Sequence, residues 1–371
     1  MISIKEIAAL FLKLGITGFG GPAAHIAMMR QEVVVKKGWM TEEHFLGLLG
    51  ATNLIPGPNS TEMAIHIGYD KGGWKGLLAA GLSFILPAVL ITGIFAWLYR
   101  KYGQLPEVQP FIYGIQPAII SIIIAAVYPL AKASIKTTFL AVLAVAVLLG
   151  TLLGVSELYL MFGAGLLTLG KALAGRSKPM NSFAPLAALP WLTDHTTSIT
   201  ILQLFWICLK IGAILYGSGY VLFAFLDTEL VSTGILTRHQ LMDAITVGQI
   251  TPGPVFSSVT FIGYQINGTT GAVIATIAIF LPSFVFVALL RPLMKVIRKF
   301  SAFSAFLDAV NVASVALVAG MCITMGKAAI ADWRTLCITM LSGFILFRFR
   351  QLNSVYVVAG GALLGYLLQL I

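Results

Sequence analysis

The chain has 371 residues, of which 58% are hydrophobic and only 10% are charged, and its mean hydropathy is +0.93. Soluble domains carry roughly 25% charged residues, so this composition excludes a soluble protein and indicates a polytopic membrane protein. The net charge of +10 is better explained by basic cytoplasmic loops than by nucleic-acid binding, because the background is apolar. Cys208, Cys322 and Cys337 lie in apolar segments without CxxC spacing, so we expect buried small side chains rather than metal ligands.

The N-terminal stretch, residues 1–14, is amphipathic. It lacks a basic n-region and a small-residue cleavage site, so we expect no signal peptide to be removed. Residues 4–26 form the first apolar segment, which is interrupted by Gly-Phe-Gly-Gly-Pro at 18–22, and residues 29–43 are polar and charged.

A Pro-Gly-Pro triplet at 56–58 then interrupts a second apolar stretch. Proline lacks the amide donor and clashes with the preceding turn, so a helix cannot continue through it. The arms at 45–55 and 60–69 are each too short to cross a bilayer, which requires roughly 20 residues. Broken backbone is tolerated at membrane depth only inside protein or beside a water-filled cavity. We therefore predict a re-entrant helical hairpin rather than a surface loop.

Four further spans are predicted at 74–99, 111–131, 138–153 and 158–173, followed by a polar, proline-containing linker. The same order then restarts with an apolar segment at 201–226, a second Pro-Gly-Pro triplet at 252–254 between arms at 240–250 and 255–266, and spans at 272–297, 306–325, 335–347 and 355–371. We divide the chain into an N-terminal membrane repeat (1–175), a linker (176–199) and a C-terminal membrane repeat (200–371).

Matching residues separated by 195 to 197 positions indicate that the two halves arose by internal duplication. The matched pairs are Lys13 and Lys210, Gly15 and Gly212, Thr41 and Thr237, the two Pro-Gly-Pro triplets, Gly68-Tyr69 and Gly263-Tyr264, Pro87 and Pro282, and Gln116 and Asn311.

Each repeat is predicted to hold five spans and one hairpin, and an odd number of spans inverts the second repeat. With the linker in the cytoplasm, most Lys and Arg residues fall on the cytoplasmic side, as the positive-inside rule expects. The cytoplasmic residues include Lys36 and Lys37, whereas Lys5, Arg100 and Lys101 fall on the outer side. If each hairpin crosses the membrane instead, the repeats become parallel. Inverted repeats with broken helices are typical of secondary transporters, which bind substrate near the midplane.

Two lysines at equivalent positions, Lys13 and Lys210, suggest an anionic substrate. Lys13 lies nine residues into its segment, about 14 Å along a helix. A lysine at such depth is costly and by default marks a substrate or ion path. The alternative is that each side chain snorkels to the nearer interface.

The helices that restart after the triplets offer a second anion-binding feature. Their first amides have no intrahelical partner and carry the positive end of the helix dipole, so they can bind tetrahedral oxyanions. Nearby glycines could let the backbone approach an ion, or could serve close helix packing. The predicted substrate-binding residues, beside the two lysines, are Gly20, Gly21, Gly217, Ser218, Pro56, Gly57, Pro58, Asn59, Ser60, Thr61, Pro252, Gly253, Pro254 and Ser257.

Three residues are candidates for proton coupling. Glu62 has no acidic counterpart, because Ser258 takes its place in the second repeat. An intramembrane carboxylate could carry a coupled proton, pair with Lys13 or Lys210, or sit at the polar mouth of the hairpin. Histidine side chains titrate near neutral pH, so His25 and His66 could also carry protons, although a lone histidine is more often a hydrogen-bonded structural residue.

Taken together, Lys13-x-Gly15 with Phe19-Gly20-Gly21-Pro22, the two Pro-Gly-Pro triplets and the two Gly-Tyr pairs resemble the chromate ion transporter (CHR) family in its long, two-domain form. The resemblance covers nearly the whole chain. It implies export of chromate across the bacterial inner membrane, driven by the membrane potential or the proton gradient, and hence chromate resistance. Tyr216 and Ser218 depart from the Phe and Gly of the first half, and this departure could signal a different anion.

Three functions therefore compete: an exporter of chromate or a related oxyanion, an importer or exchanger of another anion such as sulfate or molybdate, and a passive anion channel. Midplane hairpins favour a carrier over a channel. The sequence contains no HExxH, GxSxG or P-loop motif, so we predict no enzymatic activity, no metal and no cofactor. The expected partners are the anion, the lipid bilayer and a second copy of the chain in a homodimer.

Overall fold

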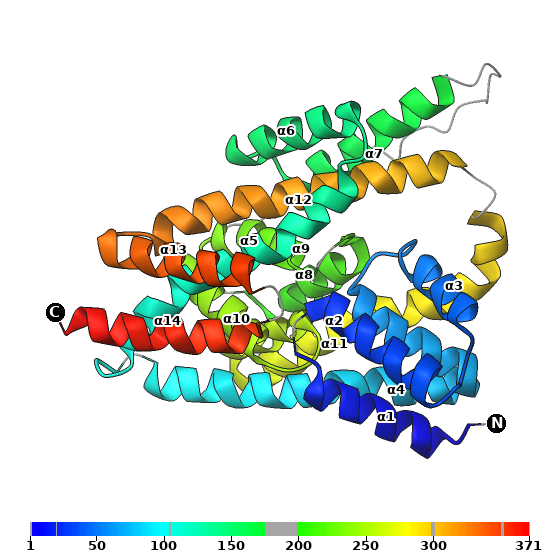
Figure 1. Ribbon diagram of the computed structural model, residues 1–371, viewed down its shortest axis with the longest axis horizontal. Helices are drawn as coiled ribbons and strands as arrows, with labels where there is room; N and C mark the ends of the chain where they lie inside the picture. Colours follow the sequence, from blue (N-terminus) through cyan, green and yellow to red (C-terminus); the bar gives the residue numbers. More distant parts are fainter. Residues whose placement is uncertain are drawn as a thin grey trace.

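The computed structural model describes residues 2–19, 21–103, 105–174, 199–217, 219–297, 301–349 and 352–370, and within these ranges every regular element is a helix (Figure 1). The first half contains α1 (Ile4–Thr17), α2 (Gly21–Arg30), η1 (Gln31–Lys36), α3 (Glu42–Thr52), α4 (Asn59–Tyr102), α5 (Gln109–Ser134), α6 (Thr138–Leu152) and α7 (Glu157–Ala174). The second half contains α8 (Ile201–Ile214), α9 (Val221–Leu226), η2 (Asp227–Val231), α10 (Arg238–Ile250), η3 (Val255–Ser257), α11 (Ser258–Ile297), α12 (Ser301–Ala329), α13 (Trp333–Arg348) and α14 (Ser354–Gln369).

Four helical stretches in the described residues are long and apolar enough to cross a membrane, namely Asn59–Tyr102, Gln109–Ser134, Val255–Leu289 and Ser304–Ala329. Each of the first and third carries an exposed apolar stripe at every fourth position, which keeps the stripe on one helix face. The stripes are Leu78, Leu82, Leu86, Leu90 and Ile94 on α4, and Val273, Ile277, Leu281, Val285 and Leu289 on α11, each 42–59% exposed. Such faces suit contact with lipid, and they confirm the predicted all-α polytopic membrane protein.

Both α4 and α11 reverse direction at a glycine. In α4 the break falls at Gly72 and Gly73, where Gly73 has φ +57°, and in α11 it falls at Asn267 and Gly268, where Gly268 has φ +55°. The first limb then lies against the second, since a Cβ built on Gly68 would meet the Gly76 carbonyl oxygen at 2.3 Å. Each helix is therefore a short limb that follows a Pro-Gly-Pro triplet, joined to a long apolar limb.

The first segment of the chain folds back on itself, which differs from the prediction of one apolar span at 4–26. Helix α1 runs antiparallel to α2 and η1, as three contacts show: Glu6 with Lys37 at 3.3 Å, Lys13 with Glu32 at 2.9 Å, and Gly18 with His25 at 3.0 Å. This pairing brings the start of α1 to the end that carries Lys37. The prediction that Lys5 and Lys37 lie on opposite sides is therefore wrong. The first segment is not a single span, so it no longer counts among the five spans predicted for the repeat.

The long limbs of α4 and α11 nevertheless run antiparallel, side by side. A Cβ on Gly81, near the start of the long limb of α4, would touch Phe284, far along the long limb of α11, whereas Arg100, near the end of α4, approaches Gly268, at the start of the long limb of α11. Residue numbers thus rise along one limb while they fall along the other. This antiparallel geometry is the one expected for inverted repeats, and it does not depend on how many spans each repeat holds. The orientation of the repeats in a bilayer stays a prediction.

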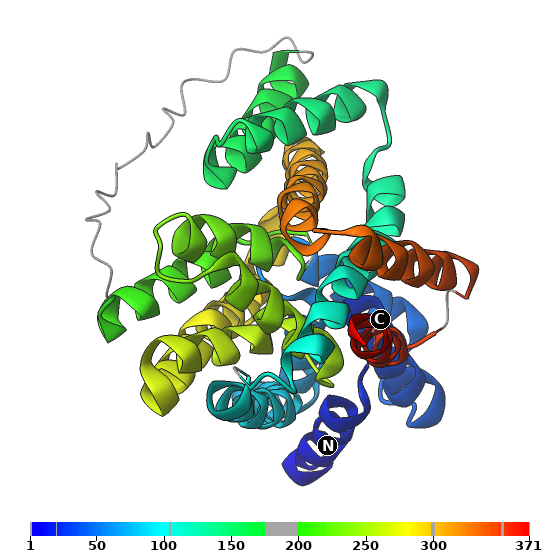
Figure 2. The same cartoon turned by 90° about the vertical axis from the view of Figure 1, so that its left-hand side faces the viewer.

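The shorter helices form pairs along the remaining long ones. Helices α6 and α7 pack along α12, while α13 and α14 pack along α5. Figure 2 views the end that carries the C-terminus, and there α6 and α7 lie above the central helices whereas α13 and α14 lie beside them. The bounds of these helices agree with the segments predicted at 138–153, 158–173, 335–347 and 355–371, and that each crosses the membrane stays a prediction. Cys208 and Cys322 are buried as predicted, but Cys337 on α13 is exposed, because it lies on the outer face of a helix at the edge of the molecule.

Candidate functional site

The two Pro-Gly-Pro breaks lie at the interface between the halves, and each is bound by the other half. The Gly57 amide donates to the Leu215 carbonyl at 2.7 Å, and the Gly253 amide donates to the Gly18 carbonyl at the same distance. The donors are equivalent positions of the two repeats, and so are the acceptors, as expected for elements related by a two-fold axis. Each acceptor lies where α8 or α1 ends, so four broken helices converge on one interface.

The first break is enclosed by protein. Pro56, Gly57 and Pro58 are buried, and α4 begins directly after them. The amides of Thr61 and Glu62 donate to the Pro58 carbonyl, whereas helix geometry leaves those of Asn59 and Ser60 without an intrahelical acceptor. Ser60 and Thr61 are buried, and the Asn59 side chain donates to Asn53. These amides are the group that could bind an oxyanion at this break.

The second break carries hydroxyl groups in place of a carboxylate. Pro252, Gly253 and Pro254 are buried. The Thr92 hydroxyl of α4 lies 3.3 Å from that of Ser257 and 3.5 Å from that of Thr251. A Cβ on Gly253 would lie 2.9 Å from that of Ala88, so the first half packs closely against this break.

Glu62 is fully buried beside the first break. Its Oε1 lies 2.1 Å from the place of a Cβ on Gly57, and the Ser283 hydroxyl lies 2.9 Å from that place. Neither carboxyl oxygen meets hydrogen-bond geometry with any described group, although Ser283 and the Tyr216 phenol are close enough to interact electrostatically. Glu62 therefore pairs with neither Lys13 nor Lys210, which removes one of the three roles considered for it.

The two predicted lysines are engaged in equivalent ion pairs. Lys13 Nζ lies 2.9 Å from Glu32, and Lys210 Nζ lies 2.6 Å from Glu229. The partner stands 19 residues after the lysine in both halves. The side chain of Lys13 is 58% exposed and that of Lys210 is 33% exposed, so neither amine is a bare charge in the interior.

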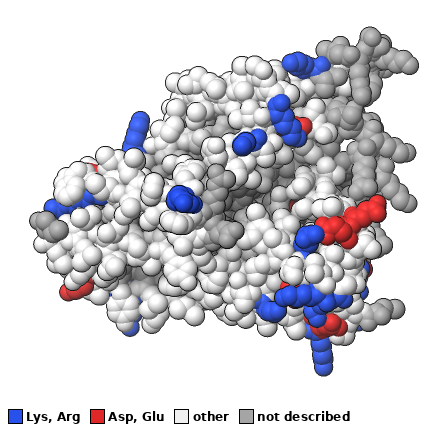
Figure 3. All heavy atoms as spheres, in the orientation of Figure 1, with Lys and Arg blue, Asp and Glu red and all other residues white. Residues whose placement is uncertain are grey.

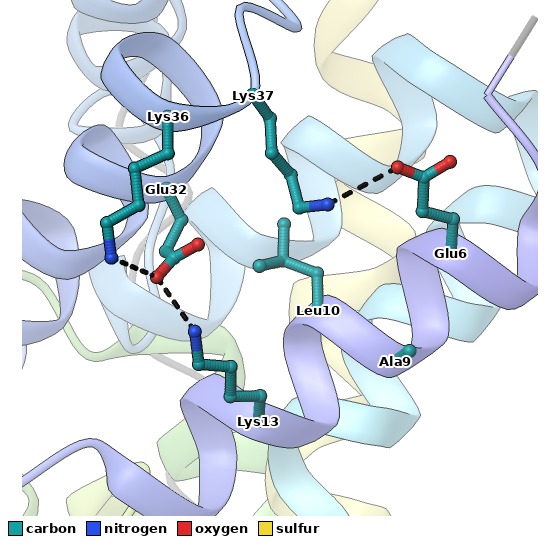
Figure 4. A pocket seen from close by; sticks show the side chains of 7 residues that line it. All are labelled: Glu6, Ala9, Leu10, Lys13, Glu32, Lys36 and Lys37. Atoms are coloured by element: carbon teal, nitrogen blue, oxygen red, sulfur yellow. Dashed lines mark hydrogen bonds and ion pairs between the residues drawn. The ribbon is translucent and has the colours of Figure 1, made fainter.

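A surface hollow of about 440 Å³ lies around Lys13 (Figure 4), lined by Glu6, Ala9, Leu10, Lys13, Glu32, Lys36 and Lys37. Glu32 accepts hydrogen bonds from both Lys36 and Lys13. These bonds, with that of Lys36 the larger cause, hold the pKa of Glu32 below its usual range, so the carboxylate is ionised at neutral pH. Figure 3 shows charged side chains gathered over this end of the molecule, around the N-terminal helices.

The remaining predicted residues divide between the interface and its surroundings. Gly21, with φ +80°, lies near the Tyr220 phenol of the other half, and Gly217, with φ +91°, packs on Asn311 and Ser314. His25 Nε2 is 3.0 Å from the Gly18 carbonyl that also accepts from Gly253. The His66 ring is 3.4 Å from the Thr52 hydroxyl. Gly20 and Ser218 lie outside the described residues.

Sequence reasoning missed a polar cluster that joins the halves. Asp243 on α10 accepts from the Tyr99 hydroxyl at 2.6 Å and from Gln116 Nε2 at 3.1 Å, and the His239 ring lies 3.3 Å from Gln116 Oε1. An acidic residue inside an apolar arm is the signal that could have identified it. The repeat offset shared by Glu32 and Glu229 could likewise have identified the partners of the lysines.

The equivalent faces of α3 and α10 have different surroundings. On α10 the face is buried, and this helix packs on α5, α12 and α14. On α3 two of the three positions are exposed, and no described atom lies within 4 Å of a Cβ built on either glycine. The residues compared are Asp243, Thr246 and Gln249 on α10, and Gly47, Gly50 and Asn53 on α3.

Comparison with known proteins gives a consistent result. The family model described as chromate transporter matches residues 5–169 and again residues 202–366. A chromate transport protein of Cupriavidus metallidurans is 33% identical over 98% of this chain and 92% of its own length. A probable chromate transport protein of Synechococcus elongatus is 31% identical over 92% of this chain and 89% of its own length. A chromate transport protein of Pseudomonas aeruginosa is 27% identical over 99% and 92% of the two lengths. No solved structure matches this chain.

Proposed function

Because the chain belongs to the chromate transporter family, we propose that it is a secondary transporter that exports chromate across the bacterial inner membrane and so confers chromate resistance. The observation that carries this proposal is the reciprocal meeting of the two Pro-Gly-Pro breaks between the halves. Broken helices at a repeat interface expose backbone amides to an anion at the middle of the membrane. At the second break the hydroxyl of Ser257, which accepts from Thr92, adds a donor.

The membrane potential suffices to drive export of a dianion. Moving one charge through 100 mV is worth about 2.3 kcal/mol, so an exiting dianion gains roughly 4.6 kcal/mol from a negative interior. A proton gradient is a further source, to which Glu62, His25 and His66 are the candidate contributors. We further propose that this multi-pass protein lies in the inner membrane and forms a homodimer.

Lys13 and Lys210 remain candidates for the substrate path, with a condition that follows from their ion pairs. Each amine must leave its glutamate, or share it, before it can contact an anion. The alternative is that each pair only holds the broken segment closed, with the anion bound by the hairpin amides alone.

The test is chromate flux in proteoliposomes under an imposed potential, with sulfate and molybdate as competitors. Saturable, potential-driven chromate flux is expected. Non-saturating flux would indicate a channel, and flux of a competitor without chromate flux would indicate another anion. Lys210→Met alone is expected to lower flux roughly tenfold. If Lys210 only neutralises Glu229, the double variant Lys210→Met/Glu229→Met restores flux, whereas a double variant that stays inactive assigns Lys210 to the anion. Lys13 and Glu32 are tested in the same way.

A further inference from the structure

The carboxyl group of Glu62 is fully buried against the break, and two neighbouring backbone positions offer it no free amide. The N-cap of α4 is Pro58, which has no amide hydrogen. The amide of Gly57 is already bound to Leu215 of the other half. Neither carboxyl oxygen meets hydrogen-bond geometry with any group in the part of the chain that the structure describes.

Within the described residues, no lysine or arginine forms an ion pair with Glu62. From α11 the neighbour is the Ser283 hydroxyl, which also lacks a hydrogen bond of good geometry, and from the segment after α8 it is the Tyr216 phenol. On its own limb, one turn further on, the His66 ring contacts Thr52 of α3. His25 of α2 is directed to the Gly18 carbonyl.

The two lysines predicted to lie within the membrane, Lys13 and Lys210, are bound to Glu32 and Glu229. An ionised carboxylate without a partner is costly in a membrane interior. It would also repel an anion at the amides of Asn59 and Ser60, which lie within one helical turn of it.

We propose that Glu62 carries the coupled proton, and that an oxyanion binds the first Pro-Gly-Pro break only while this carboxyl group is protonated. The inference rests on the proposed function and adds regulation to the same site. The proton arrives from water on one side, resides on a Glu62 oxygen while the anion is bound, and leaves with it on the other side. A chromate dianion that leaves with one proton transfers one net negative charge, so a negative interior still drives export. Of the two energy sources named above, this scheme uses the membrane potential and not the proton gradient.

The second half limits this coupling to one proton. Ser258 occupies the position equivalent to Glu62, and its hydroxyl donates to the Val255 carbonyl at 2.9 Å. Ala88 occupies the position equivalent to Ser283. The second break therefore has no group that titrates near neutral pH at this place, and the expected stoichiometry is one proton for each anion.

The experiment measures initial chromate flux in proteoliposomes between about pH 6 and about pH 8.5 at fixed potential. Wild-type flux is expected to fall at least about fivefold as pH rises, because fewer carboxyl groups carry a proton. Glu62→Gln keeps the shape and stays neutral, so its flux is expected to persist and to vary less than about twofold. Ser258→Ala, at the equivalent position, is the matched control and is expected to keep the wild-type pH profile.

A pH-sensitive dye recorded with the flux provides the second measurement. About one proton is expected to move with each chromate in the wild type and none in Glu62→Gln. Wild-type flux that ignores pH and moves no protons, or requires sodium ions instead, would overturn the inference, as would a Glu62→Gln profile identical to that of the wild type. If Glu62→Gln fails to fold, the number of protons that the wild type moves with each chromate decides whether transport is proton-coupled. No wild-type chromate flux at any pH would instead contradict the proposed function.

Discussion

At the scale of single residues, three constraints coincide at Gly57. Its φ of +133° lies in the region that favours glycine, and a Cβ there would lie 2.1 Å from Oε1 of Glu62 and 2.9 Å from Oγ of Ser283. Its amide also forms one of the two equivalent bonds that the Pro-Gly-Pro breaks donate to the other half. A Cβ added at Gly57 would therefore strain the backbone, collide with Glu62 and Ser283, and disturb the hydrogen bond to Leu215.

We predict that Gly57→Ala lowers chromate flux at least about tenfold and lowers the thermal midpoint of the purified protein, since an unfavourable backbone conformation alone costs about 1–3 kcal/mol. Gly93→Ala is the matched control, because Gly93 lies in the long limb of α4 with no described atom within 4 Å of a Cβ. It is expected to leave both quantities unchanged or slightly raised. Equal behaviour of the two variants would show that Gly57 is not constrained as its geometry indicates.

At the scale of elements, the hairpins that hold α3 and α10 are equivalent in sequence but not in environment. Both begin at a threonine N-cap, Thr41 or Thr237, which explains that matched pair. The face of α10 that carries Asp243 is covered, because Tyr99 and Gln116 donate hydrogen bonds to this residue. The corresponding face of α3 is open, with Asn53 exposed. Because it carries the amide of Asn53, this uncovered face is expected to be in contact with water.

This difference predicts unequal labelling by a water-soluble maleimide. In a background where exposed Cys337 is replaced by serine, Gly50→Cys is expected to react at least about tenfold faster than Thr246→Cys, its equivalent on α10. Saturating chromate is expected to narrow the gap if the hairpins exchange environments during transport. Equal rates without substrate would contradict the contrast between the two faces.

Sequence reasoning succeeded where a residue type has one physical consequence. A Pro-Gly-Pro triplet in an apolar segment must break a helix, and the repeat offset identified equivalent positions that the structure places in equivalent contacts. It failed on the direction of the chain after a break. The glycines at 18–21 are compatible with a helix that continues or reverses, and the reversal depends on α1 pairing with η1 through Lys13 and Glu32.

Sequence patterns also could not identify which residues contact each other across the interface. Gly57 and Leu215 are far apart in the sequence, and any carbonyl at the end of a broken helix could have accepted that bond. Both lysines were identified as exceptional, but their glutamates were not sought, so a charge that is neutralised was interpreted as a bare one. The site was therefore predictable as a list of residues, and its internal pairing was not.

At the scale of the whole molecule, each half completes the break of the other. The two amide-to-carbonyl bonds, the antiparallel long limbs and the cluster around Asp243 all join one half to the other. We therefore predict that neither half folds into an active unit alone. Residues 1–185 and 186–371, produced together, are expected to co-purify and to recover at least about a tenth of the wild-type flux.

Each fragment produced alone is the control, and it is expected to be inactive and poorly stable in detergent. Activity of either fragment by itself would contradict the mutual dependence of the breaks. Co-purification without flux would show that the linker does more than join the halves.

The lone carboxyl group of Glu62 has a consequence for ancestry. A complex of two identical chains related by a two-fold axis must carry such groups in pairs, so it can hold two or none. Joining two copies of an ancestral gene into one reading frame removes that restriction, because each copy then mutates independently. The serine at position 258 and the glutamate at position 62 are such a divergence. Fusion of the genes is therefore what permits an odd number of acidic groups at the centre of a nearly symmetric protein.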